Sequence, residues 1–283
     1  MANQASRPRT IKQCFNDSLP FIQHPTRLVP FEFRPGTKTS QIDAPKFWIS
    51  TNERGWSEPA HNTLRPMNMN ALQEQVSWPE PSMRLACEAD VVRAAALYLL
   101  HPINQVLSAR YPNDYRCNSE VAGSGVRGDV SLLKLGGRRT FAIVEFKRSG
   151  IISPMEFADA QRTLTGNPNT HAAEISQHVQ NVIAADNGDN RFSAFEGNSF
   201  SLMKQAAAYA VQYSTRFVAI FGWDYLVLVY FPELDMNLRE PEGCGNYCEI
   251  TMIPNNPPSP NLRAALLGFL FHAYDATPFT LPG

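Results

Sequence analysis

The chain has 283 residues, of which 43% are hydrophobic and 18% charged, and its formal net charge is −1. This composition fits one globular domain with an appendage, or two small domains, and it excludes a uniformly basic protein that coats nucleic acid. There is no apolar run of the ~18 residues that a transmembrane helix needs, and the N-terminus lacks the apolar segment of a secretory signal. Five scattered cysteines suit free thiols in a reducing compartment. We therefore expect an intracellular protein without membrane attachment, in either the nucleus or the cytoplasm.

Residues 1–80 are rich in proline and polar residues and show little periodicity. Strand-like pieces occur here, but prolines interrupt them. We predict an N-terminal arm, partly extended, that packs over the core through Phe31, Phe33, Phe47 and Trp48. Disorder is the competing interpretation, and the aromatic content of residues 20–50 argues against it for that part.

Regular structure is expected to begin near Ser82 with a strong helical pattern, and we place the main domain at residues 81–283. Apolar residues recur with helical spacing, and His101-Pro102 is predicted to end the helix. The apolar positions are Leu85, Val92, Ala96 and Leu99. Glu88 lies at the edge of the buried face, where a carboxylate needs a partner. Taken alone, Glu88 is better explained as a boundary residue of an amphipathic helix.

A short strand, 116–121, is followed by Gly-Ser-Gly-Val-Arg-Gly at residues 123–128. These letters match the glycine fingerprint of dinucleotide-binding proteins, in which the loop must open a helix that meets the pyrophosphate. Here the following residues are strand-like. We therefore interpret the glycines as a turn that allows another backbone to approach Asp129.

Two strands are predicted at 129–135 and 139–147, joined by a turn at Gly136-Gly137. The second strand is apolar on both of its faces and should lie at the centre of a covered sheet. Glu145 and Lys147 are two residues apart and therefore point to one face, with Phe146 on the other. Opposite charges in a covered strand are costly unless they face a cleft or bind a ligand.

Residues 149–200 resemble an insertion, with a helix predicted at 170–185. This helix carries His171 and His178, and two histidines without a third ligand usually lie on a surface or pack against a partner. A second helix, 201–213, places Gln205 and Tyr209 on one face, a spacing that most often marks an ordinary helix surface.

Strands at 216–221 and 225–231 come next, and a closing amphipathic helix spans 261–274. Cys244 and Cys248 form a pair without the second pair that a zinc site requires. The element order predicts an α/β domain with three layers, in which helices cover both faces of a central mixed sheet.

Charge is unevenly distributed along the chain. Residues 127–148 hold six basic residues against two acids, a local charge of +4, and residues 224–249 hold six acids against Arg239, a local charge of −5. The basic residues are Arg127, Lys134, Arg138, Arg139, Lys147 and Arg148. A basic zone around two acids is typical of a site that cleaves a polyanion, but a solvated hairpin would give the same pattern.

This arrangement resembles the PD-(D/E)XK nuclease superfamily, and more narrowly fungal nuclease-like proteins. The family motif places Asp on one strand and (Asp/Glu)-x-Lys on the next, which corresponds here to Asp129 and to Glu145-Phe146-Lys147. Members of the RecB and lambda-exonuclease type add Gln-x-x-x-Tyr on a later helix, which corresponds to Gln205 and Tyr209. Many members add a glutamate on the first helix, here Glu88. Gly128 stands where the family often has proline.

The resemblance implies a restriction-endonuclease-like core and a metal-dependent nuclease that acts on nucleic acid, with DNA favoured. Asp129 and Glu145 would bind Mg²⁺ or Mn²⁺, together with Glu88 and the Phe146 carbonyl. Lys147 would orient the attacking water or stabilise developing charge.

Gln205 and Tyr209 would position the substrate, and Arg127, Arg148 and Lys204 are candidates for phosphate contacts. Two alternatives stay open. One is a catalytically inactive protein of the same fold that binds nucleic acid or protein, and the other is an unrelated metabolic α/β enzyme that uses the glycine-rich loop.

Overall fold

The computed structural model describes residues 9–23, 41–76, 83–123, 126–136, 138–185, 192–238, 243–255 and 261–278. Within these ranges, the backbone alone is described for residues 120–123 and 126–128. None of the helices in these ranges is both long and apolar enough to cross a bilayer.

The fold is α/β, built on one mixed sheet of eight strands in the order β2-β3-β4-β6-β7-β8-β1-β5. β2, β3 and β4 form an antiparallel meander, β4 pairs in parallel with β6, and β6, β7 and β8 are antiparallel. β1 and β5 add in parallel beyond β8. The strands are β1 (Phe47–Ser50), β2 (Tyr115–Gly123), β3 (Val126–Lys134), β4 (Arg139–Phe146), β5 (Gln161–Arg162), β6 (Phe217–Phe221), β7 (Tyr225–Tyr230) and β8 (Tyr247–Pro254).

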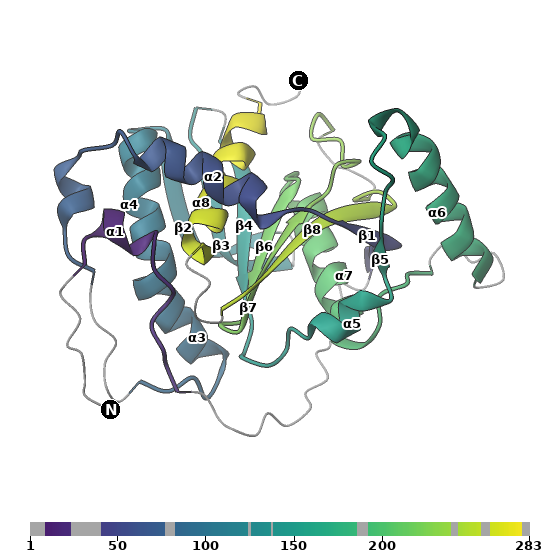
Figure 1. Ribbon diagram of the computed structural model, residues 1–283, viewed down its shortest axis with the longest axis horizontal. Helices are drawn as coiled ribbons and strands as arrows, with labels where there is room; N and C mark the ends of the chain where they lie inside the picture. Colours follow the sequence, from purple (N-terminus) through teal and green to yellow (C-terminus); the bar gives the residue numbers. More distant parts are fainter. Residues whose placement is uncertain are drawn as a thin grey trace.

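Helices cover both faces of this sheet (Figure 1). One face packs against α8 and the α3–α4 segment, and the other packs against α7 and α5. The helices are α1 (Ile11–Cys14), α2 (Glu53–Leu64), α3 (Glu88–Ala95), α4 (His101–Arg110), α5 (Pro154–Ala158), α6 (His171–Ala185), α7 (Gly197–Gln212) and α8 (Leu262–Ala276), with a π-helical segment η3 (Ala96–Leu100) and short 3₁₀ turns η2 (Asn70–Gln73) and η4 (Pro168–Thr170).

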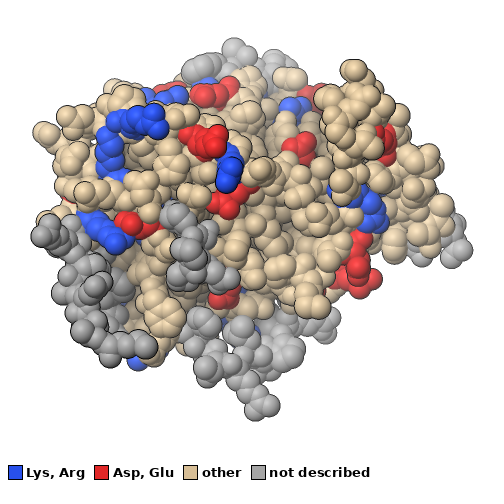
Figure 2. Space-filling model, viewed as in Figure 1, with Lys and Arg blue, Asp and Glu red and all other residues tan. Residues whose placement is uncertain are grey.

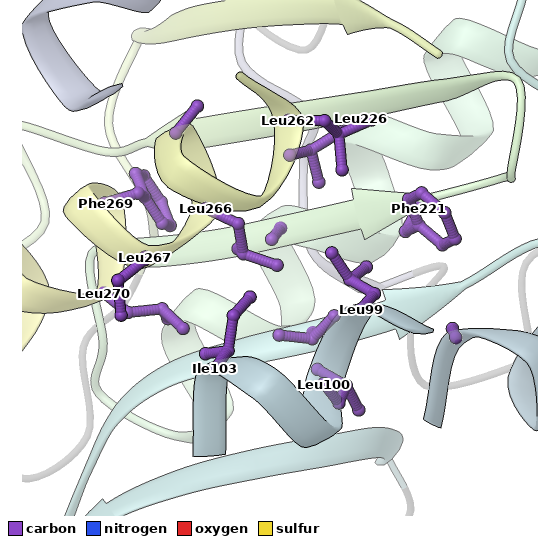
Figure 3. Packing of buried hydrophobic residues seen from close by; sticks show 14 of the residues in the cluster. Leu99, Leu100, Ile103, Phe221, Leu226, Leu262, Leu266, Leu267, Phe269 and Leu270 are labelled. Carbon is purple, nitrogen blue, oxygen red and sulfur yellow. The ribbon is translucent and has the colours of Figure 1, made fainter. Parts of the chain in front are cut away.

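The larger core lies between the sheet and α8. Figure 3 shows Leu266 and Leu270 of α8 reaching toward Leu99 and Ile103, with Phe221 beyond them. All five side chains are buried, and each contributes about 1.5–3 kcal/mol relative to an exposed position. The closing helix is buried around nearly its whole circumference rather than on one face only, because α2 covers the side that faces away from the sheet.

The expectation that regular structure begins near Ser82 is wrong, because residues 41–76 supply β1 and α2. α2 crosses α8 at Gly268, where a Cβ atom would lie 1.8 Å from the carbonyl oxygen of Trp56. The Trp56 ring packs edge-on against Phe269, at 5.3 Å between centroids. This helix was not predicted from the sequence because Gly55 and Pro59 weaken its intrinsic helix propensity. Tertiary contacts stabilise it instead.

The predicted aromatic anchors Phe47 and Trp48 are buried in β1, as expected. Phe31 and Phe33 lie outside the described residues.

The first helix of the main domain does not end at His101-Pro102 but runs from Glu88 to Arg110 through the π-helical segment. Pro102 has no N–H, so it cannot donate to the Tyr98 carbonyl four residues earlier. Arg263 of α8 supplies that bond instead, with its Nε 2.6 Å from the Tyr98 oxygen. The buried guanidinium therefore allows the helix to continue past the proline.

Several other predicted elements are confirmed with small shifts of their ends. The predicted strand at 129–135 is confirmed as β3, which begins three residues earlier, at Val126 within the glycine-rich stretch, where no helix opens. α6 begins at His171, and α7 begins at Gly197, four residues before its predicted start, with Glu196 as its N-cap. β8 was not predicted.

Candidate functional site

Asp129 lies within β3, on the strand next to Glu145, which is near the end of β4. The antiparallel register pairs Val130 with Val144, and its next position sets Asp129 opposite Glu145. Directly opposed residues of an antiparallel pair point to the same face of the sheet. Asp129 Oδ2 also accepts a hydrogen bond of 2.8 Å from the Phe146 N–H, which ties this carboxylate to the end of β4.

A buried polar network gathers around Glu145. Lys147 Nζ lies 2.5 Å from Glu145 Oε1, and the Gln205 side-chain amide donates to the same oxygen at 2.8 Å. Gln205 also hydrogen-bonds the Tyr209 hydroxyl. Glu145 and Lys147 are 4% and 3% exposed, so this is a desolvated ion pair rather than a surface one. The structure thus brings together five of the candidate site residues, Asp129, Glu145, Lys147, Gln205 and Tyr209.

The strand and helix geometry explains why these residues converge. Ile143, two residues before Glu145, packs in the core beneath α7, so this face of β4 looks toward α7. Gln205 and Tyr209 are one helical turn apart on α7 and therefore both face the strand. The Lys147 N–H continues the pairing with β6 by donating to the Phe221 carbonyl at 2.8 Å.

The pKa of Glu145 is raised to about 7 because burial raises it most and the neighbouring Asp129 carboxylate adds to the rise, while Lys147 opposes it. Burial and the Glu145 carboxylate also raise the pKa of the Tyr209 phenol. In both groups the largest cause is burial, which disfavours the charged form, and a neighbouring carboxylate adds to the shift.

A metal ion fits this donor set in part. Glu145 Oε2 and Gln205 Oε1 are buried and lack a hydrogen-bond partner within the described part of the chain, which leaves two oxygen atoms for a ligand. Hard divalent cations prefer such oxygens, and a cation beside Asp129 and Glu145 would offset their mutual repulsion. The described residues contain no group of three His, Cys, Asp or Glu side chains close enough to hold an ion by themselves.

Glu88 is the first residue of α3 and is exposed. It lines the same cleft as Asp129, a space of about 650 Å³ between the α3–α4 segment and the strands β2, β3 and β4. Its carboxylate is outside the Glu145 hydrogen-bond network. Phe146 also lines this cleft, and its backbone N–H, rather than its carbonyl, makes the contact with Asp129.

The predicted basic zone is largely not a surface feature. Lys134 is buried and donates to the carbonyls of Tyr274 and Thr277, and buried Arg139 donates to the Met236 carbonyl. These cations satisfy carbonyl oxygens near the β3–β4 turn, far along the strands from Asp129. Neither the polyanion-site interpretation nor the solvated-hairpin interpretation fits them.

The candidate phosphate contacts have different surroundings. Arg148 is half-buried directly after Lys147. Lys204 is half-buried beside Gln205 on α7, with its Nζ 5.6 Å from the centre of the Phe200 ring. The Arg127 side chain lies outside the described part of the chain. On the face shown in Figure 2, basic and acidic side chains are interspersed in small groups, without a broad patch of one sign.

Sequence reasoning missed the tether beyond Lys147. Asp224, in the turn between β6 and β7, accepts hydrogen bonds from the Ser149 hydroxyl and from the Gly150 N–H, the latter at 2.8 Å. This contact holds the chain just after Lys147 against the neighbouring strand pair. Its residues are 75 positions apart in sequence, and a local pattern contains no signal for such a contact.

The histidines of α6 lie away from this site. His178 packs edge-on against the Phe47 ring at 5.6 Å, and His171 Nε2 lies 2.8 Å from the Thr165 carbonyl. Both histidines are partly exposed and contact other residues of the same chain. All five cysteines are free thiols.

Comparison with protein-family models, with curated proteins and with solved structures gives no significant match.

Proposed function

We propose that this protein is a metal-dependent nuclease of the PD-(D/E)XK type that hydrolyses phosphodiester bonds, with DNA as the favoured substrate. The observation that carries the proposal is the convergence on one buried carboxylate. Lys147, directly after the same strand, and Gln205 from α7 both contact Glu145 Oε1, and Asp129 lies on the neighbouring strand. Residues from three separate elements meet in the combination that the resemblance implies.

The order of elements supports the same proposal. A helix (α3–α4) precedes three antiparallel strands, a crossover helix (α7) follows, and β6 then pairs in parallel with β4. This is the helix, three strands, helix, strand order of the superfamily, and we infer a restriction-endonuclease-like core on that basis.

Asp129 and Glu145 would hold Mg²⁺ or Mn²⁺, with the Phe146 carbonyl and Glu88 as further candidates. Such an ion would lower the pKa of a bound water and polarise a phosphate oxygen. The protein's own contribution is positioning. Gln205 fixes the orientation of the Glu145 carboxylate, because its amide donates to Oε1 and leaves Oε2 available.

Lys147 supplies the cation of the site. Its ammonium is buried beside Glu145, where a charge acts through a medium less polar than water. It is therefore placed to stabilise negative charge that develops on a phosphate next to the two carboxylates. The hydrogen bond from the Gly150 N–H to Asp224 limits movement of the chain that follows Lys147.

The alternative is a protein of this fold that binds nucleic acid or another protein without turnover. One observation favours it: the carboxylate proposed to bind metal is already engaged by Lys147 and Gln205. An engaged carboxylate of this kind can stabilise a fold without taking part in chemistry.

Cleavage assays distinguish the two proposals. Purified protein is incubated with labelled DNA and RNA in Mg²⁺, in Mn²⁺ and in EDTA. We expect metal-dependent cleavage that Asp129→Ala and Lys147→Ala abolish, while circular dichroism shows that the fold is kept. Binding without cleavage in any metal supports the inactive protein, and equal activity of Asp129→Ala and wild type excludes the assigned site.

A further inference from the structure

The cleft beside Asp129 differs chemically from the network around Glu145. It lies on the opposite side of the sheet from α7, since Val130 and Phe146, which line it, belong to the core beneath α8. Its volume of about 650 Å³ falls in the range of small-molecule sites. It is thus a separate compartment that shares Asp129 with the proposed metal site.

The walls of this cleft are mostly apolar. Ala89, Val92, Ala96, Leu100, Val130 and Phe146 supply the apolar surface, and Asn104, Cys117 and Ser119 add small polar groups. The charged lining residues are Glu88 and Asp129, and no lysine or arginine joins them within the described part of the chain. A phosphate inside the cleft would face two carboxylates and no lysine or arginine among the described lining residues, so an anionic group is disfavoured there, and the apolar walls favour an uncharged, largely apolar occupant.

A wide turn of helix shapes one wall. η3 runs from Ala96 to Leu100, and the His101 N–H donates to the Ala96 carbonyl five residues earlier. Such π-helical turns are rare and occur frequently at functional sites. Both ends of the turn line the cleft, and Ala96, the exposed end, leaves space there because its side chain is a single methyl group.

We propose that this cleft receives an unstacked nucleobase of the substrate strand, next to the phosphate held at Asp129. This inference rests on the proposed nuclease function and specifies its substrate as a single strand or a frayed strand end. A nucleobase is flat, uncharged and largely apolar, with a few hydrogen-bonding groups at its edges. A base within a duplex enters such a cleft only after leaving its stack, and the cost of leaving is least in a single strand.

The test fills the cleft without disturbing the core. Ala96→Phe places a ring in the space, and Ala89→Phe, also at an exposed position, is a second variant in case the first fails to fold. Leu97→Phe is the matched control, because Leu97 is the next residue of η3, is 37% exposed and is not among the residues that line the cleft. Circular dichroism and thermal melts verify folding.

Binding is measured by fluorescence anisotropy in Ca²⁺, and cleavage under single-turnover conditions in Mg²⁺ or Mn²⁺. The probes are a single strand, the blunt duplex of the same sequence, and the single strand with abasic positions. We expect roughly tenfold preference for the single strand, in line with the usual contribution of a stacked base. Ala96→Phe should remove this preference, Leu97→Phe should keep it, and wild type should bind the abasic strand as weakly as Ala96→Phe binds the normal strand.

Two results overturn the inference while leaving the nuclease proposal intact. One is a wild-type enzyme that cuts the duplex as well as the single strand, and the other is a cleft-filled variant that binds and cuts as wild type does. If wild type neither binds nor cuts any of the probes in any metal, the nuclease proposal itself fails, and the nucleobase site fails with it.

Discussion

Gln205 offers a direct test of whether the buried network serves metal binding. Its amide donates to Glu145 Oε1 at 2.8 Å and to the Tyr209 hydroxyl. A hydrogen bond to a charged group contributes about 1.5–3 kcal/mol, and loss of a group that orients a metal ligand costs about 10–100-fold in affinity or activity. The two estimates agree, because tenfold corresponds to about 1.4 kcal/mol. We expect Gln205→Ala to weaken Mn²⁺ binding by about 10–100-fold with the fold intact.

The expected weakening of Mn²⁺ binding follows from the pKa of the Glu145 carboxyl. Burial already raises the pKa of its carboxyl, and removal of a donor raises the pKa further, so a proton competes more strongly with the ion. Mn²⁺ affinity is measured by calorimetry at pH 7.5, with Gln212→Ala as the control, because Gln212 is exposed at the end of the same helix. Unchanged affinity in Gln205→Ala would refute the positioning role. Tighter binding would mean that the amide competes with the ion, as expected for a protein without turnover.

Three further predictions concern stability. The pKa of Glu145 is about 7 in the folded protein, above its usual 4.5. In EDTA, its contribution to the free energy of unfolding is therefore present below pH 4.5 and is lost, by about 3 kcal/mol, as the pH rises through 7. Glu145→Gln should flatten this part of the pH dependence measured by urea unfolding, and a pH dependence identical to that of wild type would contradict the raised pKa. Gly268→Ala should destabilise the protein by at least ~2 kcal/mol, because the new methyl group meets the Trp56 carbonyl at 1.8 Å, whereas Gly166→Ala, with nothing within 4 Å, should not. Arg263→Lys should lower the unfolding free energy by roughly 2–4 kcal/mol, because the guanidinium donates to four backbone carbonyls; a change below ~0.5 kcal/mol would show that lysine replaces it.

Local patterns in the sequence determined the centre of the sheet. β4, β6 and β7 were predicted to within one residue at each end, because covered strands are continuously apolar and are bounded by glycine-containing turns, whereas β3 begins three residues before its predicted start. The same alternation set Glu145 and Lys147 on one face, and the helical period set Gln205 and Tyr209 together. These candidate site residues could be predicted from the sequence because each pair lies within one predicted element.

Contacts between distant segments decided the rest. The helix at Glu53–Leu64 carries a glycine and a proline and forms where α8 offers it a packing surface. Pro102 is tolerated inside a helix because Arg263, remote in sequence, satisfies the carbonyl that the proline leaves without a donor. A local sequence pattern predicts a helix break at both positions, because the residues that compensate for the glycine and the prolines are distant in sequence and lie outside the segment that the pattern covers.

The basic residues near the site show the same difference between what a sequence pattern predicts and what tertiary contacts decide. Sequence counting groups Lys134, Arg139 and Lys147 into one basic zone, yet the first two bind carbonyls near the β3–β4 turn and only Lys147 reaches Glu145. Sequence alone determined which residue types are available and on which face of each element they lie. Tertiary structure decided which of them meet, that Glu145 is buried with one oxygen that has no hydrogen-bond partner among the described residues, and that an apolar cleft opens beside Asp129. The reason is physical: periodicity is a property of one segment, whereas burial and pairing depend on the segments that pack against it.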